Sequence, residues 1–114
     1  MNLPTFLLKL NNTPNQLEFN DTLAVIESLY TFTPVAFKNG ELMNAAGQNS
    51  GSCKLFAFAQ IQNFSVEQTL ACFGAYYRND VLENPEGSDH MNIRNFMRYG
   101  WHGILYHVKA LTPK

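Results

Sequence analysis

Residues 35–44 read VAFKNGELMN and contain the strongest turn signal in the chain. Asn39-Gly40 suits the centre of a type I′ turn, because both residue types tolerate the positive φ angles that this turn requires. Apolar residues on both sides of the pair fit two short antiparallel strands. This stretch therefore predicts a β-hairpin, so we do not expect a fold built from helices alone.

Helical patterns lie before and after the hairpin. Apolar spacing predicts a short helix over residues 4–11 and a second helix that is capped by Asn20 and stopped by Pro34. A third helix, capped by Ser50 or Ser52, is expected to continue to about residue 62. Each carries apolar side chains at helical spacing, as helices that pack on a core do.

Two further helices are expected in the second half of the chain. Residues 65–68 read SVEQ, a capping-box pattern that opens a fourth helix. Its apolar stripe continues to Tyr77, with Gly74 inside the helix. The fifth helix is expected to begin at a cap on Ser88 and to end at Gly100, a residue type typical of helix C-termini.

The last segment has the periodicity of a strand. Residues 104–109 alternate between two faces, which predicts a C-terminal strand. About five helices, a β-hairpin near residues 35–44 and this strand together predict an α+β fold. A chain of 114 residues is long enough to bury one hydrophobic core, so residues 1–114 are expected to form a single compact domain.

Composition narrows the classes of partner. The net charge is −1, so no basic excess points to nucleic acid. The longest apolar runs, such as residues 55–59, are too short to span a membrane. Two distant cysteines and three histidines lack the paired short spacings of a zinc site. We therefore expect no nucleic-acid or membrane partner, no metal and no cofactor.

A polar loop at residues 47–54 is the first candidate binding site. Its sequence, GQNSGSCK, leads from a flexible stretch into the expected third helix. Unpaired N–H groups at a helix start attract anions. Gln48, Asn49, Ser52 and Lys54 would then bind a small anion, and an ordinary capped loop is the alternative.

The same loop places Cys53 at a helix start, where a thiol can become more acidic and more nucleophilic. Catalysis would also need a base nearby, and His90 is a candidate. A small thiol-dependent enzyme is therefore one hypothesis for the function. The alternative is that both cysteines are reduced thiols packed in the core.

The second candidate binding site is a face of the expected fifth helix. His90, Arg94 and Arg98 follow one another at intervals of four residues, which places them on one stripe. Such a stripe could bind a phosphate group or a protein partner. Alternatively, it is a solvated face whose arginines pair with acidic residues nearby.

Several blocks of the sequence are characteristic of a known family. They are FTPVAFKNG at residues 32–40, AGQNSGSCK at 46–54, EQTLACFGAYYR at 67–78, PEG at 85–87, HMNIRNFM at 90–97 and GW at 100–101. On these blocks the chain resembles the bacterial HopJ type III effector family. The blocks lie between residues 19 and 103, which is most of the chain.

The resemblance implies how the protein reaches a host cell, but it does not imply a chemical reaction that the protein catalyses. It implies a protein of the bacterial cytoplasm that a type III secretion apparatus delivers into a host plant cell, and it brings no catalytic residues. Residues 1–17 contain no acidic residue, as in type III signals, but the apolar cluster at residues 6–10 suits a folded segment. A resident cytoplasmic protein is therefore the alternative. We expect a non-enzymatic protein that binds a host protein, a bacterial protein or a small anion.

Overall fold

The computed structural model describes all residues from 1 to 114. Its α-helices are α1 (Leu3–Asn12), α2 (Phe19–Leu29), α3 (Ser50–Gln62), α4 (Val66–Ala71) and α5 (Met91–Tyr99). Its strands are β1 (Tyr30–Phe32), β2 (Phe37–Asn39), β3 (Leu42–Asn44), β4 (Ile104–Tyr106) and β5 (Leu111–Pro113). Two 3₁₀ turns, η1 (Pro14–Gln16) and η3 (Gly100–Gly103), and a π-helix, η2 (Tyr76–Val81), complete the fold. The expected α+β class is confirmed.

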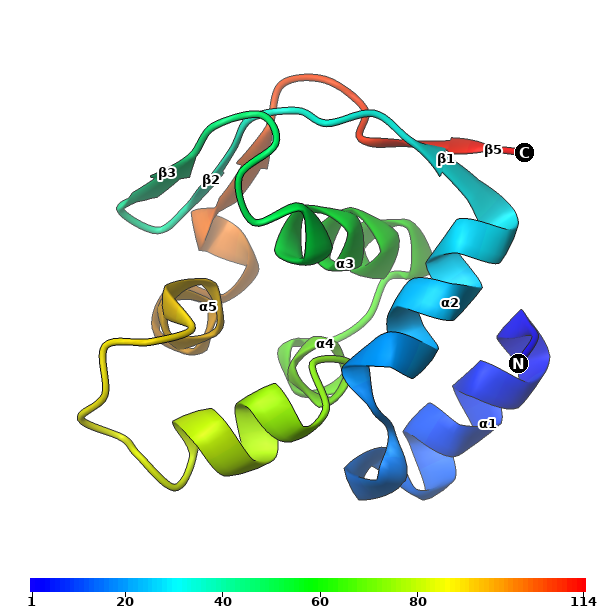
Figure 1. Ribbon diagram of the computed structural model, residues 1–114, viewed down its shortest axis with the longest axis horizontal. Coiled ribbons are helices and arrows are strands. Elements are labelled where there is room, and N and C mark those ends of the chain that lie inside the picture. The colour runs from blue at the N-terminus through cyan, green and yellow to red at the C-terminus, as the bar shows by residue number, and fades with distance from the viewer.

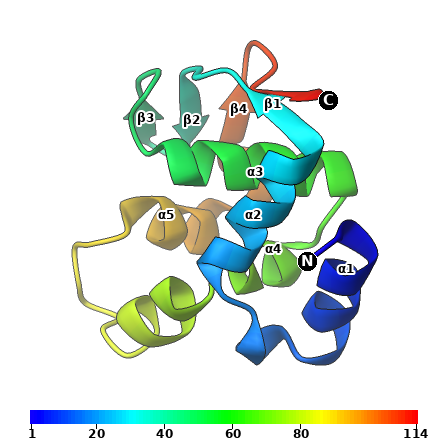
Figure 2. The same cartoon turned by 45° about the vertical axis from the view of Figure 1, so that its right-hand side comes forward.

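Helix α3 lies at the centre of the molecule. The strands cover one side of α3, and α4 and α5 lie on the other (Figure 1, Figure 2). Its side chains Leu55, Phe56 and Phe58 are each 0% exposed, because neighbours surround the helix on all sides. A helix that is apolar all round belongs in a core rather than on a surface.

None of the helices combines the length and the apolarity that crossing a lipid bilayer requires.

The strands form two small antiparallel sheets. Strand β2 pairs with β3 and with β4, and β1 pairs with β5. The hairpin expected near residues 35–44 is confirmed as β2 and β3. The strand expected over residues 104–109 ends at Tyr106, because the chain crosses from the first sheet to the second before β5 begins at Leu111.

The turn of the hairpin differs from the expected type I′ turn. Asn39 is the last residue of β2 and pairs with Leu42, so Gly40 and Glu41 are the turn residues. Only Gly40 has a positive φ, 62°, which is typical of a type II′ turn with glycine in its first position. The Asn39 side chain is 0% exposed and is engaged inside the protein, so this residue is held in the strand.

The expected boundaries of the second helix are wrong at both ends. Helix α2 begins at Phe19 rather than after Asn20, and the Asp21 carboxylate accepts a hydrogen bond from the Glu18 N–H at 3.0 Å. The helix ends at Leu29, before Pro34 is reached, because the following residues pair with β5 as β1. Pairing with a distant strand therefore overrides the local stop signal.

The fourth helix is shorter than expected. Its capping box is confirmed, since the Ser65 hydroxyl accepts a hydrogen bond from the Gln68 N–H at 3.1 Å. However, α4 ends at Ala71, and Gly74 has a φ of 62°. A Cβ at Gly74 would lie 2.7 Å from the backbone nitrogen of Phe19. Gly74 therefore breaks the helix where the chain passes directly against the start of α2.

We predict that Gly74→Ala lowers the free energy of unfolding by about 3 kcal/mol, through a strained φ and a collision with the backbone. Gly47→Ala is the matched control, because Gly47 has a φ of 88° but nothing lies within 4 Å of an added Cβ. The control should lose only about 1 kcal/mol, from the φ angle. Urea denaturation measures both values. Equal losses would contradict the close approach at Gly74.

Candidate functional site

A cavity of about 410 Å³ lies where the first turns of α3 and α5 face the start of α2. We call it the α3–α5 cavity. Its polar lining comes from Asn49, Ser52, His90 and Asn92. No aspartate, glutamate, lysine or arginine lines it. Its chemistry therefore comes from the backbone, from neutral amides and a hydroxyl, and from one imidazole.

Both helices begin in the same unusual way. The N-cap of α3 is Asn49 (φ 51°, ψ 48°), and the N-cap of α5 is His90 (φ 50°, ψ 48°). These left-handed conformations replace the expected caps at Ser50 or Ser52 and at Ser88. Neither N-cap side chain accepts a hydrogen bond from the first turn of its own helix. Both helix starts are therefore uncapped by side chains.

The uncapped helix starts leave backbone donors open to the cavity. The N–H groups of Gly51 and Ser52 in α3, and of Met91 and Asn92 in α5, have no acceptor in the protein. Asn92 is only 6% exposed, and an unpaired N–H at such a buried residue is rare. Free N–H groups carry the positive end of the helix dipole. Two helices therefore direct partial positive charge into one cavity.

A cluster of asparagine side chains fixes the two helix starts to the hairpin. The Asn44 Oδ1 accepts hydrogen bonds from the Nδ2 groups of Asn49 at 2.7 Å and Asn92 at 3.0 Å. The Asn92 Oδ1 accepts from the Nδ2 groups of Asn39 at 3.0 Å and Asn44 at 3.2 Å. We call these four residues the asparagine cluster. It sets the position of each helix start relative to the other.

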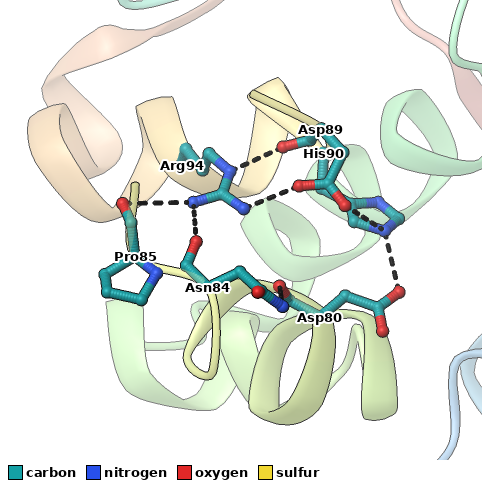
Figure 3. A network of polar contacts seen from close by, with 6 residues as sticks. All are labelled: Asp80, Asn84, Pro85, Asp89, His90 and Arg94. Carbon is teal, nitrogen blue, oxygen red and sulfur yellow. Dashed lines mark hydrogen bonds and ion pairs between the residues drawn. The ribbon is translucent and has the colours of Figure 1, made fainter. Parts of the chain in front are cut away.

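The His90 imidazole lines the cavity and is engaged by acidic residues. Its Nε2 lies 3.0 Å from an Asp80 carboxylate oxygen and 3.9 Å from Asp89 (Figure 3). The ring centroid is 5.1 Å from that of Tyr76. His90 thus lines the cavity with its Nε2 already engaged by Asp80.

The predicted arginine stripe does not reach the cavity. Arg94 turns back toward the preceding loop, where its guanidinium donates to the Asp89 carboxylate at 2.6 Å and to the Asn84 carbonyl at 2.8 Å (Figure 3). The hydrogen bond from the Arg94 guanidinium lowers the pKa of the Asp89 carboxyl. Arg98 lies over the Tyr99 ring at 5.3 Å. Arg94 thus stabilises the loop that precedes α5, and Arg98 packs on the Tyr99 side chain.

Two further predicted residues lie outside the cavity. The Gln48 side-chain oxygen accepts a hydrogen bond from the Ala45 N–H at 2.9 Å and so closes its own loop. The Lys54 ammonium pairs with Glu27 at 3.3 Å and lies 5.0 Å from the centre of the Phe32 ring. Lys54 therefore stabilises the contact between α3 and its neighbours.

Of the predicted binding residues, the structure brings Asn49, Ser52 and His90 together in the cavity. The cavity lining also contains Phe19 and Tyr76, which were not among the candidate site residues of the sequence analysis. Both line the cavity, because Gly74 ends α4 and turns η2 toward the start of α2. Only the long-range packing reveals this role.

The structure contradicts an accessible, base-activated Cys53. The thiol is 1% exposed, and its Sγ lies 3.7 Å from the Val35 carbonyl oxygen, with no histidine as its partner. Burial raises the pKa of the Cys53 thiol and raises that of Cys72 to about 12. The structure contains no group of three or more histidine, cysteine, aspartate or glutamate side chains that could hold a metal ion.

Comparisons with known proteins agree with the resemblance seen in the sequence blocks. A family model described as HopJ type III effector protein matches residues 3–111. The chain is also similar to a solved structure described as a crystal structure of unknown function protein VPA0580. The TM-score is 0.97, the sequence identity is 54%, and the match covers 100% of this chain and 95% of that chain. No curated protein matches the chain.

We predict that neither thiol reacts readily in the folded protein. At about pH 8, iodoacetamide should label both cysteines much more slowly in the native state than in urea, because burial removes access and a raised pKa removes thiolate. Mass spectrometry measures the two rates. The urea sample is the control for intrinsic reactivity. Native labelling of Cys53 as fast as labelling in urea would show that this thiol is accessible and activated.

Proposed function

Because the chain belongs to the HopJ type III effector protein family, we propose that it is an effector that acts by binding a small anionic ligand rather than by catalysis. The ligand would occupy the α3–α5 cavity. The observation that carries this proposal is that two helices leave unpaired N–H groups in the same cavity. Helix N-termini are among the commonest anion-binding features of proteins.

The electrostatics of the lining support an anionic ligand. No carboxylate lines the cavity. The nearest acidic residues in the surrounding network, Asp80 and Asp89, are engaged by His90 and Arg94 respectively. An anion would therefore meet the positive ends of two helix dipoles without a facing negative side chain.

The absence of a nucleophile paired with a base supports binding rather than catalysis. The Cys53 thiol is buried and donates a hydrogen bond to the Val35 carbonyl. The His90 Nε2 is held by Asp80, and no cysteine lines the cavity beside this imidazole. A covalent mechanism would need a nucleophile within hydrogen-bonding reach of a free base.

Inorganic phosphate tests anion binding directly. We predict that titration with phosphate shifts the NMR signals of the Gly51, Ser52, Met91 and Asn92 amides. Ser52→Asp should weaken binding by about tenfold, because a carboxylate within ~4 Å of the anion repels it even in high dielectric. The substitution is compatible with folding, since a negative side chain in the first turn stabilises a helix.

Ser50→Asp is the matched control for that experiment. It adds the same charge to the same helix turn, but Ser50 does not line the cavity. We expect this variant to weaken phosphate binding by less than about threefold, because water screens the more distant charge. Equal effects of the two variants, or amide shifts spread over the whole surface, would contradict binding in the cavity.

The proposed route has its own test. The protein would remain in the bacterial cytoplasm until a type III apparatus delivers it into a host cell. We predict that the full chain fused to a translocation reporter gives a signal in host cells, and that a donor strain without a functional apparatus gives none. An equal signal from both strains, or no signal from either, would mean that the protein is not a type III substrate.

A further inference from the structure

The α3–α5 cavity has aromatic side chains beside its open N–H groups. Phe19 stacks on Phe73 with ring centroids 5.9 Å apart and planes 4° apart. The Tyr76 ring meets Phe19 edge to face at 5.4 Å, and His90 lies 5.1 Å beyond Tyr76. These four rings form a continuous row, and all of them line the cavity. We call this row the aromatic wall.

Two glycines hold the aromatic wall in place. A Cβ at Gly51 would lie 2.8 Å from the Phe19 ring, and a Cβ at Gly74 would lie 2.7 Å from the Phe19 backbone nitrogen. The absence of a side chain lets Gly51 of α3 approach the Phe19 ring and lets the segment before η2 approach the Phe19 backbone. The ring also packs against Phe73 and Tyr76, which restricts its position as recognition of a ligand by shape requires.

Tyr76 keeps an open surface in this row. Its side chain belongs to the π-helix η2, an irregularity that is frequent at functional sites. The residue is 44% exposed, although its ring contacts Phe19 and lies beside His90. Arg78 anchors η2 by donating to the Leu17 carbonyl at 2.6 Å. Tyr76 thus presents an aromatic surface that is partly open to solvent.

From these contacts, and resting on the proposed function, we infer that the ligand is a small aromatic anion: a planar ring that carries a carboxylate or a phosphate. The anionic group would accept hydrogen bonds from the N–H groups of α3 and α5. The ring would lie against Phe19 and Tyr76. Aromatic pairs prefer offset-stacked or edge-to-face geometry and add binding energy beyond the burial of apolar surface.

The size and the lining of the cavity agree with this ligand class. A volume of about 410 Å³ lies at the lower end of the range for small-molecule sites. The cavity has both polar groups and an apolar wall, so it suits a ligand with one polar group and one apolar ring. An anion without a ring would leave the aromatic wall exposed to water. A neutral ring would leave the buried Asn92 N–H without an acceptor.

Four probes separate the two parts of the ligand. Benzoate carries both a ring and an anion, and acetate has only the anion. Benzamide keeps the ring but has a neutral amide in place of the carboxylate, and cyclohexanecarboxylate replaces the aromatic ring with an aliphatic one. We expect benzoate to bind about tenfold more tightly than acetate and about threefold more tightly than cyclohexanecarboxylate, through apolar burial and ring contacts. Benzamide should bind more weakly than benzoate. NMR titration of the full chain measures all four, and phenyl phosphate against inorganic phosphate repeats the test for the other anionic group.

Substitutions at Tyr76 provide the matched pair of variants. Tyr76→Leu keeps an apolar side chain but removes the ring, so the preference for benzoate over cyclohexanecarboxylate should disappear. Tyr76→Phe keeps the ring and should bind as the unchanged protein does. Both variants are expected to fold, because Tyr76 is 44% exposed.

The outcomes distinguish this inference from the proposed function. If benzoate and cyclohexanecarboxylate bind equally, or if Tyr76→Leu keeps the preference, the aromatic ligand is excluded while anion binding stands. If acetate binds as tightly as benzoate, the aromatic wall takes no part in recognition. If neither benzoate nor phosphate shifts the amides of the cavity, the proposed function itself fails.

Discussion

The asparagine cluster is the constraint on which the arrangement of this protein depends. Asn44 in β3 and Asn92 at the start of α5 exchange hydrogen bonds of 3.0 and 3.2 Å. Asn39 joins Asn92 from β2, and Asn49 joins Asn44 from the N-cap of α3. A buried amide without partners costs several kcal/mol, roughly 2–7 depending on the reference state. The Asn39 Oδ1 has no partner, but the other amide groups of the cluster bond to one another, so the hairpin and both helix starts are held in a single relative position.

This constraint explains why two helices begin without a side-chain cap. The Asn49 side chain is directed to Asn44, and the His90 side chain to Asp80, so neither reaches the N–H groups of its own helix. A side-chain cap usually stabilises a helix by about 1 kcal/mol. The protein forgoes that contribution at both places, and both sets of free donors lie in one cavity. Local rules that fail together at one place are characteristic of functional sites.

Features that depend on local contacts could be predicted from the sequence, whereas features that depend on distant contacts could not. The capping box at Ser65 and the stop at Gly100 depend on residues within one helix turn, and both were predictable. The left-handed N-caps at Asn49 and His90 were not. They follow from packing that brings Asn44 to Asn92, a residue 48 positions away in the chain. Residues of the polar loop and of the fifth helix, the two candidate sites of the sequence analysis, line the same cavity, and their meeting point depends on this long-range pairing.

Charge was the part of the site that sequence reasoning placed least well, and the reason is physical. Lysines and arginines are long enough to reach partners beyond their own segment, so their position on a helix stripe does not decide where their charge lies. Lys54 pairs with Glu27 and Arg94 with Asp89, and no lysine or arginine remains in the cavity lining. The positive potential there comes from peptide dipoles, which are fixed in direction and do not titrate. Dipoles alone hold an anion of any shape, and the rigid aromatic surface beside them is what can distinguish one anion from another.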